Sequence, residues 1–341
     1  NIDFITKLSN EFNIKNINNI YKIQQEITPI LKNNQNMIKY INGVNNTLDK
    51  CVHGHKNAKN QIQRIIGQWI NGEISGYCFG FEGPPGIGKT TIAKKGISGC
   101  LLNQENKPRP FGFIAIGGSS NSSTLDGHNY TYVGSTWGRI VDILIQNKCM
   151  NPIIFIDELD KISKTEQGKE IIGILTHLVD TTQNNSFQDK YFSGIDLDLS
   201  KVLFIFSYND ADSIDRILLD RIHRIKFDKL TIEDKIVITR EYILPELYSK
   251  MGLNNIIEIS DESIEFIIEN YTCECGVRKL KEFLFEIIGE INLEQLKNEE
   301  IVELPIHLTI DIIENKYLKE HHKQNIIKIN ENTIIGIING L

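Results

Sequence analysis

The segment from Gly83 to Thr90 holds the residues with the most recognisable chemistry in the sequence. It reads GPPGIGKT and matches the phosphate-loop pattern G-x-x-x-x-G-K-[ST] at every fixed position. Glycines in such a loop let backbone N–H groups close around phosphate oxygens at the start of a helix. We expect Lys89 to bind the terminal phosphates of a nucleotide and Thr90 to offer its hydroxyl to Mg²⁺. The expected binding residues are Gly83, Pro84, Pro85, Gly86, Ile87, Gly88, Lys89, Thr90 and Thr91.

Two acidic residues end the apolar run IIFIDE at positions 153–158. At the end of a buried strand, Asp157 is expected to hold Mg²⁺ through water. Glu158 is expected to orient and deprotonate the water that attacks the terminal phosphate. An Asp-Glu pair by itself is often only two solvated acids in a turn. Next to a phosphate loop, the pair favours a hydrolase over a kinase.

Three more polar residues are expected to complete this site from separate parts of the chain. Asn209 ends the apolar run KVLFIFSYN, where its amide would lie between the attacking water and the γ-phosphate. Arg221 follows in RILLDRIHRIKF; a lone Arg is usually a surface charge, but this one is placed to serve the γ-phosphate of a neighbouring subunit. Arg278 opens an amphipathic helix after Gly276 and Val277, from which it could reach the same phosphates.

Short apolar runs, separated by segments long enough for helices, must position these residues. The runs are GYCFGFEG, FGFIAIGG, NPIIFIDE, KVLFIFSYN and RIHRIKF. Nearly continuous apolar strands that alternate with helices are typical of a parallel sheet buried on both faces. After about Leu230 the alternating strands are expected to stop, and amphipathic segments predict a helical domain, with Ser260 as one N-cap. The expected division is a helical segment at 1–47, an α/β nucleotide-binding domain at 48–229, a small helical domain at 230–320 and a linker with one strand at 321–341.

The composition predicts a soluble intracellular protein. The chain has 341 residues, 40% apolar and 24% charged, which suits about two globular domains. No apolar run is long enough to span a bilayer and the start lacks a secretory signal, so we expect a cytoplasmic protein or one of an organelle matrix. The six cysteines show no Cys-x-x-Cys spacing and are expected to be reduced thiols. The formal charge of −7 disfavours nucleic acid as a partner.

The motifs together resemble the ATPase module of Lon-type ATP-dependent proteases, within the AAA+ superfamily. GPPGIGKT, LDGHNYTYVGSTWGRI, PIIFIDELDKIS, NSFQDKYF, LDLSKVLFIFSYN, DRILLDR and YTCECGVRKL follow in that family's order, between about Leu48 and Tyr317. The resemblance implies an AAA+ P-loop fold that binds ATP and Mg²⁺. Such a fold has a five-stranded parallel sheet followed by a small α-helical lid.

Several residues receive a specific role only from this resemblance. It implies that Asn209 is sensor 1, Arg221 the arginine finger and Arg278 sensor 2. His53 and Gly54, in CVHGHKNAK, lie where the family holds the adenine, although a lone His is more often an ordinary surface residue.

The resemblance also explains the aromatic residues between Leu125 and Ile140. Tyr132 and Val133 would form a pore loop at the centre of a hexameric ring of identical subunits. Apolar contacts there would grip an unfolded polypeptide without reading its sequence. Tyr130 and Trp137 are expected to be packing residues.

Some segments depart from the family pattern. The run GKEIIGILTHLVDTTQNNSF replaces a proline-containing segment that usually ends in Leu-Asp-Pro-Glu-Gln-Asn, and Lys281 stands where Arg is common. No Ser and Lys occur in the setting of the family's peptidase domain. The tail ENTIIGIINGL resembles only the first strand of that domain, so the family implies a Ser-Lys peptidase domain after Leu341.

The expected function is ATP-driven unfolding and translocation of unfolded or misfolded proteins toward that peptidase domain. One alternative is a stand-alone AAA+ remodeller without peptidase activity. A second is a nucleic-acid motor of the same fold, which the negative charge and the aromatic pore loop disfavour.

Overall fold

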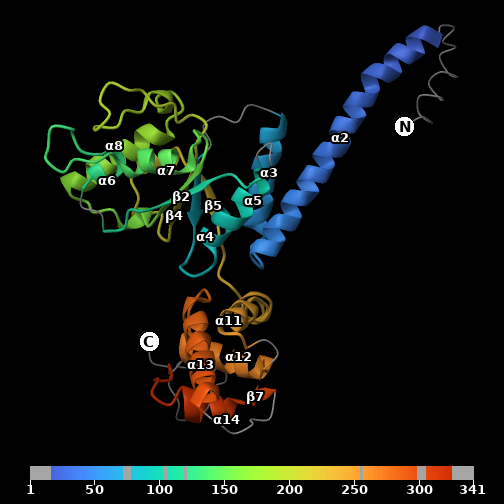
Figure 1. Cartoon of the computed structure of the whole chain (residues 1–341), viewed down its shortest axis with the longest axis vertical. Coiled ribbons are helices and arrows are strands. Elements are labelled where there is room, and N and C mark those ends of the chain that lie inside the picture. The colour runs from blue at the N-terminus through green and yellow to red at the C-terminus, as the bar shows by residue number, and fades with distance from the viewer. Residues whose placement is uncertain are drawn as a thin grey trace, which may run out of the picture.

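The computed structural model of the chain describes residues 17–71, 78–102, 106–118, 121–253, 256–297 and 305–324. It contains a long N-terminal helix, an α/β region built on one sheet, and a helical region beyond that sheet (Figure 1). The strand expected near the end of the chain falls outside the described residues. Within them, no helix is both long and apolar enough to cross a membrane.

The five apolar runs form one parallel sheet, which confirms the predicted core of the fold. Its strands are β1 (Cys78–Glu82), β2 (Phe111–Ala115), β3 (Ile153–Asp157), β4 (Leu203–Tyr208) and β5 (His223–Lys226). Their order across the sheet is β2-β3-β4-β1-β5, and every neighbouring pair is parallel. The carboxyl ends of β1, β3 and β4 therefore meet at one edge of the sheet, where the predicted site residues follow them.

The strands β3 and β4 are buried on both faces because their alternate side chains enter two different cores. In β3, Ile153 and Phe155 belong to one hydrophobic cluster, and Ile154 and Ile156 belong to the other. The same alternation holds in β4, all six residues of which are buried. This double burial explains why the strands read as continuous apolar runs.

Helices on either side of the sheet supply the rest of the two cores. They are α3 (Lys56–Asn71), α4 (Lys89–Thr91), η1 (Ile92–Ile97), α5 (Ser98–Cys100), α6 (Ser123–Asp126), α7 (Arg139–Asn147), η2 (Leu159–Lys161), α8 (Glu166–Val179), η3 (Asn184–Ser186) and α9 (Arg216–Asp220). The segments α4, η1 and α5 follow one another without a break, as the helix after the phosphate loop.

The N-terminal helix α2 (Ile17–Cys51) runs without interruption through the expected domain boundary at 47. Its first part extends away from the α/β region (Figure 1), whereas its last turns pack on α3 and η1. Val44 and Leu48 are buried there. The end of α2 is thus part of the α/β core, and the domain division itself stays a prediction.

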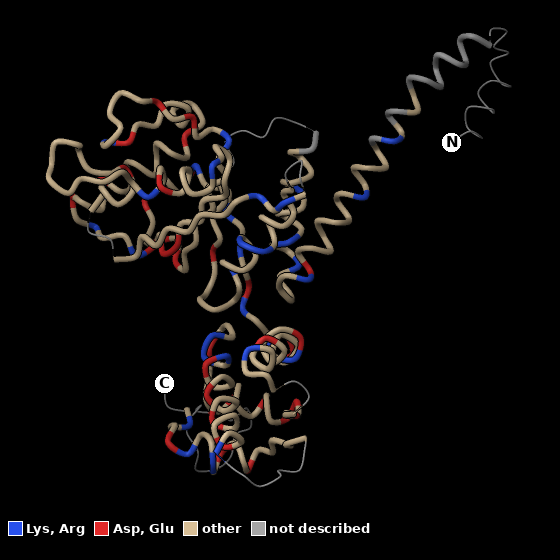
Figure 2. Tube along the Cα trace, viewed as in Figure 1, with Lys and Arg blue, Asp and Glu red and all other residues tan. Residues whose placement is uncertain are grey.

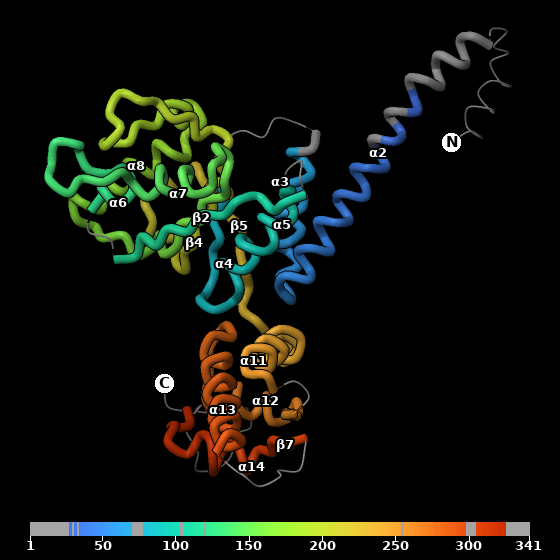
Figure 3. The backbone as a smooth tube through the Cα atoms, viewed as in Figure 1, coloured from blue at the N-terminus to red at the C-terminus, as the bar shows by residue number. Residues whose placement is uncertain are grey.

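The chain leaves β5 by one connection and then forms the helical lid (Figure 3). The lid helices are α10 (Ile232–Ile238), η4 (Thr239–Ile243), α11 (Leu244–Met251), α12 (Asp261–Ile267), η5 (Ile268–Thr272), α13 (Arg278–Lys297), α14 (Ile310–Ile312) and η6 (Ile313–Tyr317). The predicted N-cap is confirmed, because Ser260 Oγ accepts a hydrogen bond from Ser263 N at 3.2 Å.

The expectation that strands end after Leu230 is wrong. Two short strands, β6 (Ile257–Ile259) and β7 (Ile306–Leu308), pair in parallel within the lid. Each has only three residues. A strand this short shows too little alternation or apolar length to be recognised in a sequence.

Candidate functional site

A cleft of about 810 Å³ lies between the phosphate loop of the α/β region and the lid. Its walls come from the end of α2, from residues that follow β3 and β4, and from lid helices that include α10 and α13. The predicted site residues that line it are His53, Pro85, Gly86, Ile87, Gly88, Lys89, Thr90, Thr91, Asp157, Glu158, Asn209 and Arg278. The predicted residues that do not line it are Gly54, Gly83, Pro84, Tyr132, Val133 and Arg221.

The phosphate loop is shaped by glycines and rests against the lid. Gly86 and Gly88 have φ values of 78° and 94°, in the left-handed region that glycine adopts without strain. Val277 N donates a hydrogen bond to Gly86 O at 3.1 Å. A Cβ on Gly276 would lie 2.5 Å from the same oxygen, so the close approach of the lid requires glycine there. This contact places Arg278, the first residue of α13, beside the phosphate loop.

The ammonium group of Lys89 is surrounded by oxygen atoms. It donates to Gly83 O at 2.5 Å, to Tyr208 O at 3.0 Å and to Asn209 Oδ1 at 2.8 Å. Only 8% of the residue is exposed, and this burial lowers the pKa of Lys89 to about 8, although nearby carboxylates oppose the shift. Strand β4 therefore brings Asn209 to the phosphate loop, as the sequence predicts.

The lowered pKa of Lys89 predicts a pH-dependent nucleotide affinity. Phosphate groups favour the charged lysine, so their binding raises this pKa and takes up a proton wherever the free site is neutral. We expect nucleotide affinity to fall as pH rises through about 8, and proton uptake on binding to be largest above that pH. Calorimetry in two buffers of different ionisation enthalpy measures the uptake. A constant affinity with no proton uptake across that range would contradict the assignment.

The two predicted acids lie at the end of β3, Asp157 as its last residue and Glu158 directly after it. Asp157 Oδ1 accepts a hydrogen bond from Glu158 N at 3.0 Å. Glu158 has a φ of 62°, an uncommon conformation for a residue other than glycine and one often found at functional sites. Its carboxylate is paired with Lys161 and packs so closely on Gly117 that a Cβ there would collide with it. Glu158 must therefore leave Lys161 before it can act as a base.

The oxygen atoms of the cleft suit Mg²⁺ that is bound together with a nucleotide. Asp160 Oδ2 accepts from Asn209 N at 3.3 Å, while Asp160 Oδ1 is buried with no hydrogen-bond partner. Thr90 and Asp157 line the same cleft. Mg²⁺ usually takes one or two carboxylates and completes its shell with water and substrate phosphates. Within the described ranges no cluster of three or more acidic, His or Cys side chains could hold a metal ion.

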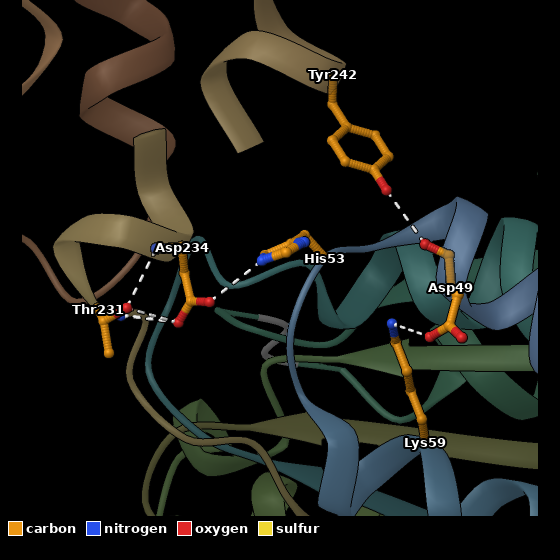
Figure 4. A network of polar contacts seen from close by, with 6 residues as sticks. All are labelled: Asp49, His53, Lys59, Thr231, Asp234 and Tyr242. Carbon is orange, nitrogen blue, oxygen red and sulfur yellow. Dashed lines mark hydrogen bonds and ion pairs between the residues drawn. The ribbon is translucent and has the colours of Figure 1, made fainter. Parts of the chain in front are cut away.

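His53 connects the α/β region to the lid at one end of the cleft (Figure 4). Its Nε2 lies 3.3 Å from Asp234 Oδ1, and Asp234 also closes the N-terminus of α10 with Thr231. Nearby, Tyr242 Oη donates to Asp49 O at 3.1 Å. His53 thus has a lid partner, and it is no free surface histidine.

Arg221 lies outside the cleft, at the end of α9. Its Nη2 is 3.2 Å from Asp180 Oδ2, and Asp180 follows directly after α8. Asp180 Oδ1 accepts from the backbone N–H and the hydroxyl of Thr182, which fixes the carboxylate. The guanidinium is therefore held at the surface by Asp180, outside the cleft that contains Lys89 and the predicted acidic pair.

The segment around Tyr132 is highly exposed. Tyr132 is 65% exposed and Val133 107%, as expected for side chains that project from a loop. The expectation that Tyr130 is a packing residue is wrong, because 67% of it is exposed. Trp137 is only partly a packing residue: it stacks on Phe192 at 6.0 Å but stays 41% exposed.

Two protein-family models match the chain in consecutive regions. Residues 79–229 match the ATPase family associated with various cellular activities, and residues 249–302 match the AAA+ ATPase lid domain of Lon protease. The chain belongs to the Lon-type AAA+ ATPases. A Lon protease homolog of Acanthamoeba polyphaga mimivirus is 38% identical over 314 residues, which cover 86% of this chain and 30% of that protein.

Cellular relatives show the same pattern of partial coverage. The Lon protease of Campylobacter concisus is 35% identical over 82% of this chain and 33% of its own length. The mitochondrial Lon protease homolog of Drosophila melanogaster is 34% identical over 74% of this chain and 24% of its own length. The Lon-type module described here thus spans about a third or less of the relatives that it matches.

Some residues of the Lon-type site were not predicted from the sequence. Asp160 and Tyr242 line the cleft, and Asp234 holds His53. His55 Nε2 lies 3.0 Å from Ile87 O of the phosphate loop. Only Asp160 carries a signal that could have been used, because it lies two residues after the predicted acidic pair in IDELD.

Proposed function

We propose that this chain hydrolyses ATP with Mg²⁺ and uses the energy to unfold and translocate polypeptides, as the ATPase module of a Lon-type protease. The observation that carries the ATPase part is the convergence of Lys89, Asp157, Asn209 and Arg278 on one cleft. Basic and acidic positions are interspersed along both regions (Figure 2), which supports a polypeptide over a nucleic acid as substrate. The peptidase domain, and an intracellular location like that of the bacterial and mitochondrial relatives, belong to the same proposal.

Each cleft residue has a separate task in this proposal. Lys89 and Arg278 bind the terminal phosphates from the loop and from the lid. Thr90 and Asp157 hold Mg²⁺, which neutralises phosphate charge when it is bound. Glu158 accepts a proton from the attacking water, and Asn209 orients that water beside the γ-phosphate.

We propose that six identical subunits assemble into a ring. Arg221 is the main structural support, since it is partly exposed and lies outside its own cleft, as a residue serving a neighbouring subunit must. Tyr132 and Val133, exposed on their loop, would face the central channel and contact the polypeptide. Comparing ATP turnover with and without an unfolded protein tests the proposal.

Arg221→Ala is expected to leave ATP affinity near that of the unchanged protein and to lower turnover strongly. An arginine that stabilises developing phosphate charge contributes roughly 10³ to 10⁵ in rate in other nucleotide hydrolases. Equilibrium binding and steady-state turnover measured on one preparation separate the two effects. A variant with weak binding and normal turnover at saturation would contradict this role.

Mixed rings test whether Arg221 acts on a neighbour. Arg221→Ala subunits retain Glu158, and Glu158→Gln subunits retain Arg221, so a mixed ring contains interfaces where both groups are intact. We expect mixing to recover part of the lost turnover. If the variants co-assemble and activity does not return, the arginine does not act across the interface.

A further inference from the structure

Residues 128–137, here called the tip loop, are closed on themselves at their base. His128 N donates to Thr136 O at 3.0 Å, and within the loop Tyr132 N donates to Asn129 O at 3.1 Å. Gly127, with a φ of 78°, precedes the loop and Gly138 follows it. The two ends of the loop therefore lie close together, and the exposed residues project beyond them.

A fully buried carboxylate fills that base. Asp189 is 0% exposed, and its Oδ2 accepts from Gly138 N at 2.8 Å while its Oδ1 accepts from Tyr191 N at 2.8 Å. A Cβ on Gly127 would lie 2.7 Å from Asp189 Oδ1, and one on Gly138 would collide with Leu125 O. Both ends of the tip loop thus close around one side chain that comes from a distant part of the sequence.

Asp189 belongs to residues 187–197, here called the strut. The strut is closed by two hydrogen bonds between Phe187 and Leu197, of 3.1 and 2.8 Å. Lys190 continues the attachment, because its N–H donates to Asp126 O at 2.7 Å and its Nζ lies 2.8 Å from Asp126 Oδ2. Asp126 immediately precedes Gly127, so Lys190 attaches the strut to the start of the tip loop through two contacts, one from its backbone and one from its side chain.

Aromatic contacts join the other end of the tip loop to the strut. Trp137 packs on Tyr191 with ring centroids 5.8 Å apart and on Phe192 at 6.0 Å. Beyond these attachments the tip is exposed, and a loop with few buried contacts samples many positions unless its base is fixed.

We propose that Asp189 is the positioning residue that holds Tyr132 and Val133 at a fixed place, so that the strut and the tip loop move as one body when a polypeptide is pulled. This inference rests on the proposed function. Force on the tip loop passes through its base, where the carboxylate joins Gly138 N at the end of the loop to Tyr191 N of the strut. Charge-assisted hydrogen bonds of this kind are stronger than neutral ones.

Asp189→Asn is the sharpest variant, because the amide keeps the shape but offers one acceptor oxygen to two N–H donors. The matched control is Asp196→Asn on the same strut, where an exposed carboxylate accepts from Gln188 Nε2 at 2.6 Å. In the protein as it occurs naturally, we expect Asp189→Asn to slow ATP-driven unfolding of a tagged protein about tenfold, the effect of losing one hydrogen bond to a charged group. ATP turnover without substrate should change much less, and the control should behave like the unchanged protein.

A local readout separates positioning from general destabilisation. These 341 residues contain two tryptophans, Trp69 in a hydrophobic core and Trp137 at the end of the tip loop, where it packs on the strut. In this 341-residue chain, Trp69→Phe leaves Trp137 as the reporter of acrylamide quenching, and Trp137→Phe leaves Trp69 as the reporter of the core. We expect Asp189→Asn to increase the quenching of Trp137 and to leave that of Trp69 unchanged. Increased quenching of both, with an equal loss of substrate-free ATP turnover, would overturn the inference in favour of a general folding role.

Tyr132→Ala, measured in parallel, separates this inference from the proposed function. Normal unfolding by Tyr132→Ala would contradict the proposed function, and with it the purpose assigned to the strut. If Tyr132→Ala is inactive in unfolding while Asp189→Asn unfolds at the normal rate with unchanged Trp137 quenching, the proposed function stands and the inference is overturned.

Discussion

Lys89→Ala is expected to abolish measurable ATP binding. The substitution removes a buried ammonium group that bonds to Gly83 O, Tyr208 O and Asn209 Oδ1 and that would exchange one of these oxygens for a phosphate. Truncating one partner of a desolvated charge pair costs about 2 to 5 kcal/mol of binding free energy, which is roughly 30-fold to several thousand-fold in affinity. Equilibrium binding of a fluorescent ATP analogue measures the loss.

Glu158→Gln is the matched comparison for this prediction. Glu158 contacts Lys161 and Gly117, and its proposed task begins only when a water attacks the γ-phosphate. We expect the variant to bind ATP with near-normal affinity and to stop at the hydrolysis step. Loss of affinity as large as in Lys89→Ala would remove the basis for a general-base role.

Tyr132→Ala is expected to abolish ATP-driven unfolding of a tagged protein while most substrate-free ATP hydrolysis is retained. The side chain is exposed and does not line the cleft, so its removal leaves the nucleotide residues in place. The variant loses an aromatic contact with the polypeptide substrate, and such a contact does not depend on the substrate's sequence. The loss of fluorescence of a tagged substrate gives the unfolding rate.

Tyr130→Ala is the control, because Tyr130 is a tyrosine of nearly equal exposure on the same loop. If the contact with substrate is specific to Tyr132, the Tyr130→Ala variant unfolds the substrate at close to the normal rate. Equal losses in both variants would mean that the loop matters only as a general aromatic surface. A fully active Tyr132→Ala would remove the pore-loop assignment.

The fold could be predicted wherever the signal was continuous along the chain. The strands β1, β3 and β4 are apolar runs because nearly all of their residues are buried, and each of the five predicted runs begins and ends close to its observed strand. The pair β6 and β7 could not be found, since three residues carry no period. The segment 1–47 is predicted only as helical, and the burial of Val44 near its end is not predicted, because Val44 packs on residues from later in the chain.

The candidate site divides in the same way between local and distant contacts. The phosphate loop and the acidic pair could be read directly, because each is a short motif that does its chemistry within a few residues. The contact of His53 with Asp234 and the fit of Asp189 into the base of the tip loop join residues far apart in sequence. Such contacts depend on the tertiary arrangement of the lid and the strut, which a local sequence pattern does not predict.

ATP turnover with and without a polypeptide substrate tests the central claim most directly. The account predicts that unfolded casein raises the turnover of the protein, that single-stranded DNA does not, and that Tyr132→Ala removes the casein effect while the substrate-free rate remains. Stimulation by single-stranded DNA and none by casein would contradict the claim that this Lon-type site drives the movement of polypeptides.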